Sequence, residues 1–275
     1  MKEQKLKGSF ISKIFKWGIV SMFFMVIGIM FINSLNYSET SYEEDSEVLS
    51  NHTYDWSKLT EENGRKNYVD NSGNEAIFGI DVSTHQGDIE WDKVKGDNVD
   101  FAIIRAGYRG YESGEINEDD KFKQNIEGAI NNGIDVGVYF FSQAISEKEA
   151  IEEAQFILNV IKGYDVKYPV VFDMEYLENG RINSLSMDER TKITLAFCEV
   201  IKESGYKPII YGNQFWLQEY VSLHHINDYE LWLAQYNDIP NFPYEFRMWQ
   251  YTDMGSVNGI KGNVDLNLWF KSDGN

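Results

Sequence analysis

The stretch PVVFDMEY, residues 169–176, places two acids, Asp173 and Glu175, two residues apart at the end of an apolar run. A β-strand turns alternate side chains to opposite faces, so both carboxylates are expected on one face, with Met174 on the other. Neighbouring carboxylates repel each other, and burial beside an apolar interior raises the pKa of a carboxyl further. Such a pair suits acid–base chemistry in which Glu175 donates a proton while Asp173 stays ionised.

Two further acids lie in other apolar runs, Asp81 in IFGIDVS and Asp265 in VDLNLWF. Because sites in parallel α/β proteins form at the carboxyl ends of strands, these acids are expected to meet the pair at one mouth. Aromatic and amide side chains at other strand ends are expected to line that mouth and bind substrate: Tyr139, Tyr211, Trp232, Gln235, Trp249, Gln250 and Tyr251. Carboxylates and aromatic rings together suit a sugar, and two carboxylates suffice for glycoside hydrolysis.

Some of these residues have a purely structural interpretation as well. Trp232 and Trp249 could serve core packing instead of substrate binding. Arg105, in IIRAGY, could offset the negative charge of the acids or form an ordinary salt bridge at a strand end. The sequence leaves both questions open.

The elements that must position these side chains alternate between β-type and helical patterns. Eight β-type runs follow residue 76, at residues 77–83, 99–108, 135–142, 168–176, 207–213, 230–236, 246–252 and 264–270. Three helical patterns lie between the early runs, at residues 118–133, 146–163 and 187–205, and each ends near a glycine, as helices often do. Near-continuous apolar strands alternating with helices predict an α/β fold with a parallel sheet. A barrel that lacks some outer helices is the preferred arrangement, and an open doubly wound sheet is the alternative.

The residues before this region predict an anchor and a tether. Residues 1–16 carry five lysines and one glutamate, and residues 17–32 carry no charge. With its flanks, this apolar run is long enough for one transmembrane helix, and the lysines before it place the N-terminus in the cytoplasm. We therefore predict a cytoplasmic stretch and membrane anchor over residues 1–35, an acidic extracellular tether over residues 36–75 and a catalytic domain over residues 76–275. A cleaved signal peptide followed by secretion is the alternative, although no small-x-small cleavage site follows the run.

The composition excludes several classes of partner and cofactor. The formal net charge of −19 argues against nucleic acid as a partner. The single cysteine, Cys198, excludes an intrachain disulfide and lies in a helix-like run that predicts a buried thiol. The four histidines lack metal-ligand spacing, and no glycine-rich phosphate loop opens a helix, so the sequence predicts neither a metal nor a nucleotide cofactor.

Three motifs together resemble a known family. GIDVSTHQGDIEWDKVK, VVFDMEY and GIKGNVDLNLW occur in the order and spacing of the glycoside hydrolase family 25 lysozymes, the Chalaropsis-type N-acetylmuramidases. The resemblance covers residues 77–270 and implies an irregular TIM-like barrel with eight strands and about five helices. It also implies hydrolysis of the β-1,4 bond between N-acetylmuramic acid and N-acetylglucosamine in peptidoglycan, without a metal or other cofactor. Phe at positions 140 and 141, where many relatives have a His in this motif, and Trp269, where Phe is common, depart from the pattern without touching an acid.

The resemblance assigns roles to the four acids. Glu175 matches the general acid, Asp173 the second acid of the pair, Asp81 the acid of the first strand and Asp265 that of the VDLN motif. An acetamido-bearing substrate also permits a substrate-assisted route, in which the carbonyl oxygen of the sugar attacks and Asp173 orients it. The alternatives are a carbohydrate-binding wall protein that has lost its chemistry, and a hydrolase that uses the acids as ligands for a hard cation.

Overall fold

The computed structural model describes residues 49–271. Its strands are β1 (Leu59–Glu62), β2 (Arg65–Tyr68), β3 (Ile77–Val82), β4 (Phe101–Arg109), β5 (Ile116–Glu118), β6 (Asp135–Ser142), β7 (Val166–Met174), β8 (Pro208–Asn213), β9 (Glu230–Ala234), β10 (Met248–Gly255) and β11 (Val264–Trp269). Its helices are α2 (Trp91–Gly96), α3 (Phe122–Asn131), α4 (Glu147–Val160), α5 (Met187–Glu203) and α6 (Gln214–Glu219), with short 3-10 helices η2 (Trp56–Lys58), η3 (Thr84–Gln86) and η4 (Arg181–Ser184).

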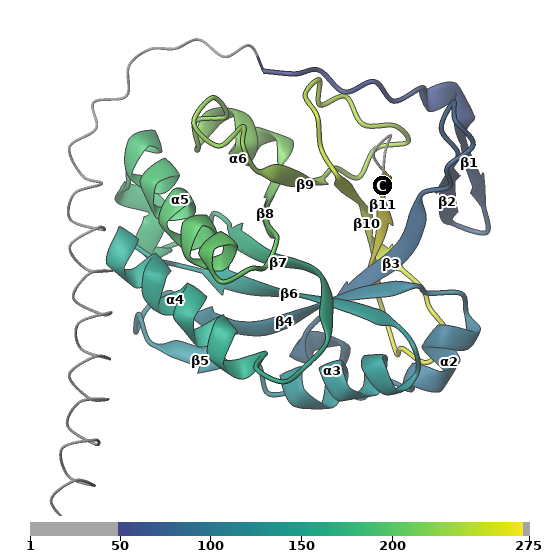
Figure 1. The fold of residues 1–275 in the computed structure, drawn as a ribbon, viewed down its shortest axis with the longest axis horizontal. Helices are drawn as coiled ribbons and strands as arrows, with labels where there is room; N and C mark the ends of the chain where they lie inside the picture. The colour runs from purple at the N-terminus through teal and green to yellow at the C-terminus, as the bar shows by residue number, and fades with distance from the viewer. Residues whose placement is uncertain (1–48, 272–275) are drawn as a thin grey trace, which may run out of the picture. The chain divides into compact units, whose positions relative to one another are not determined.

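Eight of the strands close into a barrel (Figure 1). Around it the order is β3-β11-β10-β9-β8-β7-β6-β4, and pairing of β4 with β3 completes the circle, while β5 extends β4 as an edge. All eight predicted strands are confirmed, and the closed barrel replaces the open-sheet alternative. The eight barrel strands pair in parallel except at β11, which runs antiparallel to both β10 and β3, and the edge strand β5 is antiparallel to β4. The sequence pattern did not predict this reversal, which brings the amino end of β11 to the mouth of the barrel.

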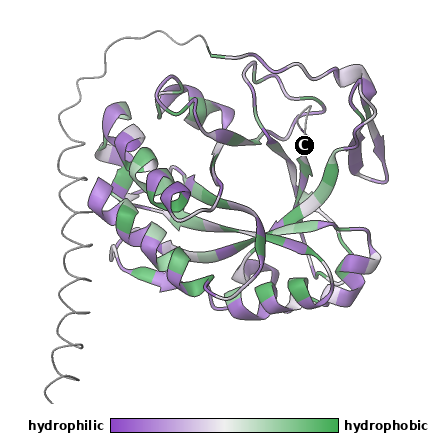
Figure 2. Cartoon of the chain, in the orientation of Figure 1, coloured by the Kyte–Doolittle hydropathy of each residue, from purple (hydrophilic) through white to green (hydrophobic). Residues whose placement is uncertain are grey.

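Residues inside the barrel alternate with residues that face the surrounding elements. A separate interior cluster contains Phe101, Ile103, Val171, Trp232 and Met248, among others. The neighbouring residues of the same strands belong to a second, larger cluster between the barrel and its covering elements. Figure 2 shows the largely hydrophobic central strands beside helices that mix hydrophobic and hydrophilic stretches. Both faces of these strands are therefore buried, which explains their near-continuous apolar sequences.

The three longest helices lie where the sequence predicts them. Ser146 caps α4 by accepting a hydrogen bond from the Glu149 backbone N–H, and Ser186 with Glu189 forms a capping box at the start of α5. The thiol of Cys198 is buried in α5, as predicted. The short helices α2 and α6 were missed because six residues give little periodicity to detect.

Part of the predicted tether, residues 36–75, is folded: from residue 49 onward the chain packs against the barrel. Residues 49–76, here called the N-terminal extension, form η2 and the β1–β2 hairpin, which lies beside β10 and β11 in Figure 1. The rings of Tyr54 and Phe270 lie 4.4 Å apart, and those of Trp56 and Trp249 lie 5.8 Å apart. The extension thus covers the outer face of the last strands. The contacts come from a few aromatic residues within an otherwise polar segment. Because these residues are not periodically spaced, the sequence pattern did not predict the contacts.

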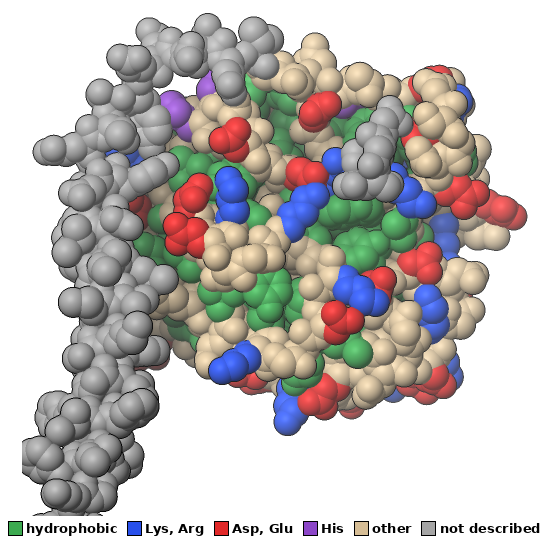
Figure 3. Space-filling view, in the orientation of Figure 1, with side chains coloured by type: hydrophobic (Ala, Val, Ile, Leu, Met, Phe, Trp, Pro, Cys, Tyr) green, Lys and Arg blue, Asp and Glu red, His purple; other side chains and the backbone are tan. Residues whose placement is uncertain are grey.

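The predicted membrane anchor falls within residues 1–35 and lies outside the described residues. Among residues 49–271, no helix combines the length and apolar character that crossing a bilayer requires. On the face of the molecule drawn in Figure 3, acidic and basic side chains are interspersed with hydrophobic ones.

Candidate active site

Asp81 is fixed by two amides in the mouth of the barrel. Its Oδ2 accepts hydrogen bonds from Gln250 Nε2 at 2.9 Å and from Asn267 Nδ2 at 2.8 Å. The side chain is buried, and this burial raises its pKa to about 6, although the two amide hydrogen bonds favour the charged form. Asp81 therefore has one fixed position and an elevated pKa.

Asp265 lies directly opposite Asp81, because β11 pairs with β3 in a register that matches these two residues. Burial, together with the neighbouring Asp81 charge, raises the pKa of Asp265 to about 9. The prediction that the first and last strands bring these acids together in a closed barrel is met. Antiparallel pairing makes it possible, since Asp265 is the second residue of its strand and Asp81 the fifth of its own.

Asp173 and Glu175 lie on the interior side of β7 and just beyond its end. Val171 belongs to the interior cluster, whereas Phe172 and Met174 pack in the outer one, so the predicted alternation holds. Burial, together with the nearby Asp265 charge, raises the pKa of Glu175 to about 7. Burial and the charges of Glu175 and Asp81 also raise the pKa of Asp173 well above its usual range. The two carboxyls therefore titrate as a coupled pair, and the ionised state of Asp173 stays a prediction.

One oxygen of this pair is left without a protein partner. Oδ1 of Asp173 is buried and accepts no hydrogen bond from the described residues. A buried oxygen without a partner costs free energy, which a hydrogen bond from a bound ligand would recover.

Arg105 forms a salt bridge with a different acid. Its guanidinium lies 2.7 Å from Oδ2 of the buried Asp119. The structural interpretation of Arg105 is therefore correct, although its positive charge still lowers the pKa of Asp173 somewhat. The acid cluster has no ion-pair partner of its own among residues 49–271.

Three of the seven predicted substrate-binding residues lie with the acids. Gln250 binds Asp81, and its Oε1 accepts a hydrogen bond from Tyr211 Oη at 3.0 Å. Tyr211 pairs across the strands with Asp173. Burial raises the pKa of the Tyr139 hydroxyl well above its usual range. The nearby charges of Asp81, Asp173 and Asp265 act in the same direction.

The other four predicted residues make no hydrogen bond to the four acids. Trp232 is buried in the barrel interior, where its Nε1 donates to Asn267 Oδ1 at 2.9 Å and so helps to hold the amide that binds Asp81. Trp249 and Tyr251 are buried on the outer side of β10, because they alternate with the inward Gln250. Gln235 lies in the loop after β9 and bonds to Asn241. Packing therefore accounts for Trp249, and direct substrate contact is unsupported for these four.

Two residues of the site were missed. Asn267 follows Asp265 by two positions in VDLN, so the alternation rule could have placed it on the same face. Tyr236 lies just beyond β9, is 51% exposed and donates from Oη to Gln250 Oε1 at 2.8 Å. Its loop position carries no periodic signal.

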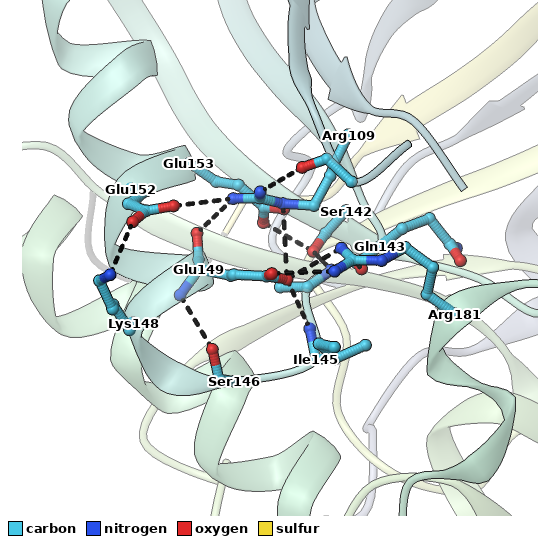
Figure 4. Close-up of polar contacts among 12 residues, drawn as sticks. Arg109, Ser142, Gln143, Ile145, Ser146, Lys148, Glu149, Glu152, Glu153 and Arg181 are labelled. Carbon is cyan, nitrogen blue, oxygen red and sulfur yellow. Dashed lines mark hydrogen bonds and ion pairs between the residues drawn. The ribbon is translucent and has the colours of Figure 1, made fainter. Parts of the chain in front are cut away.

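A polar network joins α4 to Arg109 of β4, to Ser142 of β6 and to Arg181 (Figure 4). Gln143, directly after β6, donates from Nε2 to the backbone oxygen of Glu175 at 3.1 Å. Arg181 donates to the backbone oxygen of Gln143 at 3.0 Å and binds both carboxylate oxygens of Glu149 at 2.9 Å. These contacts fix the segment that carries Glu175.

The second half of this network surrounds a buried glutamate. Glu153 of α4 accepts hydrogen bonds from Arg109 Nε and Ser142 Oγ, both at 2.6 Å. Burial raises the pKa of Glu153 to about 7, against the opposing effect of both donors. This carboxylate joins α4 to the ends of β4 and β6, so its role is structural.

The site as a whole combines carboxyls that can hold a proton, Glu175 and Asp265, with Asp81, which two amides hold in place. Elevated pKa values near neutrality are what a general acid requires. Within residues 49–271, no group of three or more His, Cys, Asp and Glu side chains is arranged to hold a metal ion.

The chain is similar to known proteins. The model of the family described as glycosyl hydrolases family 25 matches residues 80–260. The Escherichia coli K12 protein YegX is 32% identical over 201 residues, which are 70% of this chain and 69% of that protein. The autolytic lysozyme of Clostridium acetobutylicum is 28% identical over 189 residues, 68% of this chain and 54% of that one.

A solved structure is similar as well. The modular autolysin LytC from Streptococcus pneumoniae, in complex with a synthetic peptidoglycan ligand, matches with a TM-score of 0.64 and 28% identity. The match covers 77% of this chain and 52% of LytC, so the chain spans about half the length of that autolysin.

Proposed function

The chain belongs to glycosyl hydrolase family 25, and on this premise we propose that it is a lysozyme that hydrolyses peptidoglycan. The bond cleaved is the β-1,4 linkage between N-acetylmuramic acid and N-acetylglucosamine. The observation that carries the proposal is the convergence of Asp81, Asp173, Glu175 and Asp265 in the mouth of the barrel, with pKa values raised towards or beyond neutrality.

Glu175 acts as the general acid. It lies at the end of β7 beyond Asp173, and its pKa of about 7 keeps a proton available near neutral pH. The proton passes to the glycosidic oxygen as the bond to the leaving sugar breaks. The reactive form is the singly protonated pair in which Glu175 holds the proton and Asp173 carries the negative charge.

Asp173 orients the substrate. Its buried Oδ1 is free to accept a hydrogen bond from the acetamido N–H of the sugar, which would align the acetamido carbonyl oxygen for attack on the anomeric carbon. This is the substrate-assisted route. Asp81 and its two amide donors form a fixed anionic wall beside the developing positive charge.

The test is turnover of purified cell walls, followed as released reducing sugar, by the wild type and Glu175→Gln. The variant keeps the side-chain shape but removes the proton donor, so the rate should fall by about two orders of magnitude or more. Glu178→Gln, three residues along in an exposed position, is the matched control and should retain the wild-type rate. Binding of walls without turnover by the wild type would indicate the alternative, a carbohydrate-binding protein, and loss of activity in EDTA would indicate a metal-dependent hydrolase.

We also propose that residues 17–32 anchor the enzyme in the cell membrane with its catalytic domain outside. The uncharged run and the five lysines before it support this proposal. Protease treatment of intact protoplasts should shorten membrane-bound protein to a small N-terminal fragment. A mature form in the medium that begins soon after residue 32 would show that the run is a cleaved signal peptide.

A further inference from the structure

A groove of about 400 Å³ opens between the turn of the β1–β2 hairpin and the segments 236–238 and 252–256. Its volume lies within the range of about 300–1,000 Å³ that is typical of small-molecule sites. The hairpin, residues 59–68, precedes the family match, which begins at residue 80. One wall of the groove is therefore supplied by a part of this chain that the family model does not cover.

Tyr236 connects the groove to the acids. Its ring lines the groove, while its hydroxyl donates to Gln250, the residue that binds Asp81. A sugar that packs on the Tyr236 ring in the groove would therefore lie beside the residues that hold Asp81.

The charges in the groove are already paired within the protein. Lys66 donates to Glu61 Oε2 at 3.0 Å and to the Asp238 backbone oxygen at 2.9 Å, and Arg65 binds the carboxylate of Asp97. The lining contains two acids, Glu61 and Asp238, against these two cations. An anionic ligand would find no unpaired cation here, so the groove favours an uncharged one.

Exposed side chains offer contacts of the kind that sugars use. Tyr236 is 51% exposed and Met254 is 73% exposed, and both can pack against the apolar face of a pyranose ring. Asn63 and Asn237 provide amide groups for hydroxyl and acetamido groups beside them.

From these features we propose that the groove binds an uncharged N-acetylglucosamine unit of the glycan strand, beyond the sugars at the cleaved bond. The proposal rests on the proposed glycan-hydrolysing function, and it adds an affinity for longer strands to it.

The experiment compares kcat/KM of the full-length chain for peptide-free peptidoglycan glycans of four and eight sugars. The wild type should prefer the longer strand by about tenfold, the factor that one modest binding contact of about 1.4 kcal/mol supplies. Met254→Ala and Asn63→Gly should each reduce this preference at least threefold; glycine suits the positive φ of 53° at Asn63 and preserves the turn. Met187→Ala removes the same side chain from α5, where it is 41% exposed and away from the groove, and should keep the wild-type preference.

An unchanged preference in both groove variants would overturn the proposal, as would a preference that appears only when the strands carry stem peptides. If the wild type cleaves neither these glycans nor purified cell walls, the proposed function fails. Calorimetric binding of the eight-sugar glycan to the wild type and to Met254→Ala then still decides the groove, with weaker binding to the variant supporting the proposal and equal binding overturning it.

Discussion

At the scale of single residues, the site concentrates negative charge where water is scarce. Asp173 and Glu175 share one face of β7, and Asp81 faces Asp265 across β3 and β11. Burial is the largest cause of the raised pKa at each of the four positions. Only Asp81 has two amide donors that favour its charged form. The folded state therefore holds protons that the unfolded chain would release.

This proton uptake predicts how stability changes with pH. The pKa of Glu175 rises from 4.5 to about 7 on folding, so folded protein binds more protons than unfolded protein between these values. The free energy of unfolding consequently falls as the pH rises through this window, by up to about 3 kcal/mol for this residue. Glu175→Gln removes the ionisation and should raise the melting temperature at pH 7.5 by several degrees, with little difference at pH 4.

The measurement is thermal unfolding of both proteins across this pH range. Glu178→Gln, which replaces an exposed glutamate, should not change the profile. If Glu175→Gln is less stable than the wild type at pH 7.5, the carboxylate is stabilised by contacts that outweigh its burial.

Asp173 gives a second prediction at this scale. Asp173→Asn removes the charge that orients the acetamido group but retains the side-chain volume, so turnover of cell walls should fall strongly, by about a hundredfold or more. The melting temperature should be equal to or above that of the wild type, because a buried carboxyl is lost. Circular dichroism and reducing-sugar release together test this, and a variant that fails to fold would show that the pair is structural.

At the scale of elements, two features position the acids of the site: the direction of β11, and a polar network that joins α4 to the ends of two strands. The reversed β11 presents its amino end, and hence Asp265, at the mouth where the other strands present their carboxyl ends. On the far side, Glu153 joins α4 to β4 through Arg109 and to β6 through Ser142 (Figure 4). The ends of β4 and β6 are thereby held in place, and Gln143 directly after β6 binds the backbone of Glu175.

Breaking this network should destabilise the barrel in a pH-dependent way. Arg109→Met leaves Glu153 buried without its cation, which should cost about 3–5 kcal/mol at pH 8. At pH 5 the cost should be smaller, because Glu153, with a pKa of about 7, is protonated there even in the wild type. Urea unfolding at both pH values measures the difference.

The matched control is the double variant Arg109→Met with Glu153→Met, which removes both charges and should regain much of the stability lost at pH 8. An equal loss at pH 5 and pH 8 for the single variant would mean that packing and the other hydrogen bonds of Arg109, rather than the buried charge, dominate.

At the scale of the whole molecule, the N-terminal extension covers strands that no long helix covers. Helices α3, α4 and α5 follow the earlier strands, whereas β9, β10 and β11 are joined by loops. Aromatic rings of the extension cover the outer side of these last strands. They belong to Tyr54, Trp56 and Tyr68 and contact Phe246 and Phe270. The backbone of the extension also pairs with residues 243–245, as in the 3.1 Å bond from His52 N to Pro243 O.

Removing this cover should lower stability sharply. Trp56→Ala should cost about 3 kcal/mol or more, because truncating a packed tryptophan leaves a cavity between the extension and the barrel. A chain that begins at residue 77 should melt well below one that begins at residue 49, although both retain the residues matched by the family model. Thermal unfolding tests both changes, and Phe215→Ala, which truncates a 63% exposed ring, is the control that should change little.

The sequence by itself determined the properties that depend on neighbouring residues. The two-residue spacing of Asp173 and Glu175 determined that both lie on one face of the chain, and the apolar runs located all eight barrel strands, because strand periodicity is local. The same rule could have assigned Asn267 to the face of Asp265. The long helices and the buried Cys198 follow from local patterns in the same way.

Only the tertiary structure decided which side of each strand faces inward and which distant segments meet. It reversed β11, which set Asp265 opposite Asp81, and it directed Gln250 to the acids while Trp249 and Tyr251 pack on the outer side. It also folded residues 49–76 onto the barrel, although their sequence resembles a tether. These outcomes depend on which apolar surfaces remain uncovered once the barrel closes, and that free energy is shared among residues far apart in the chain.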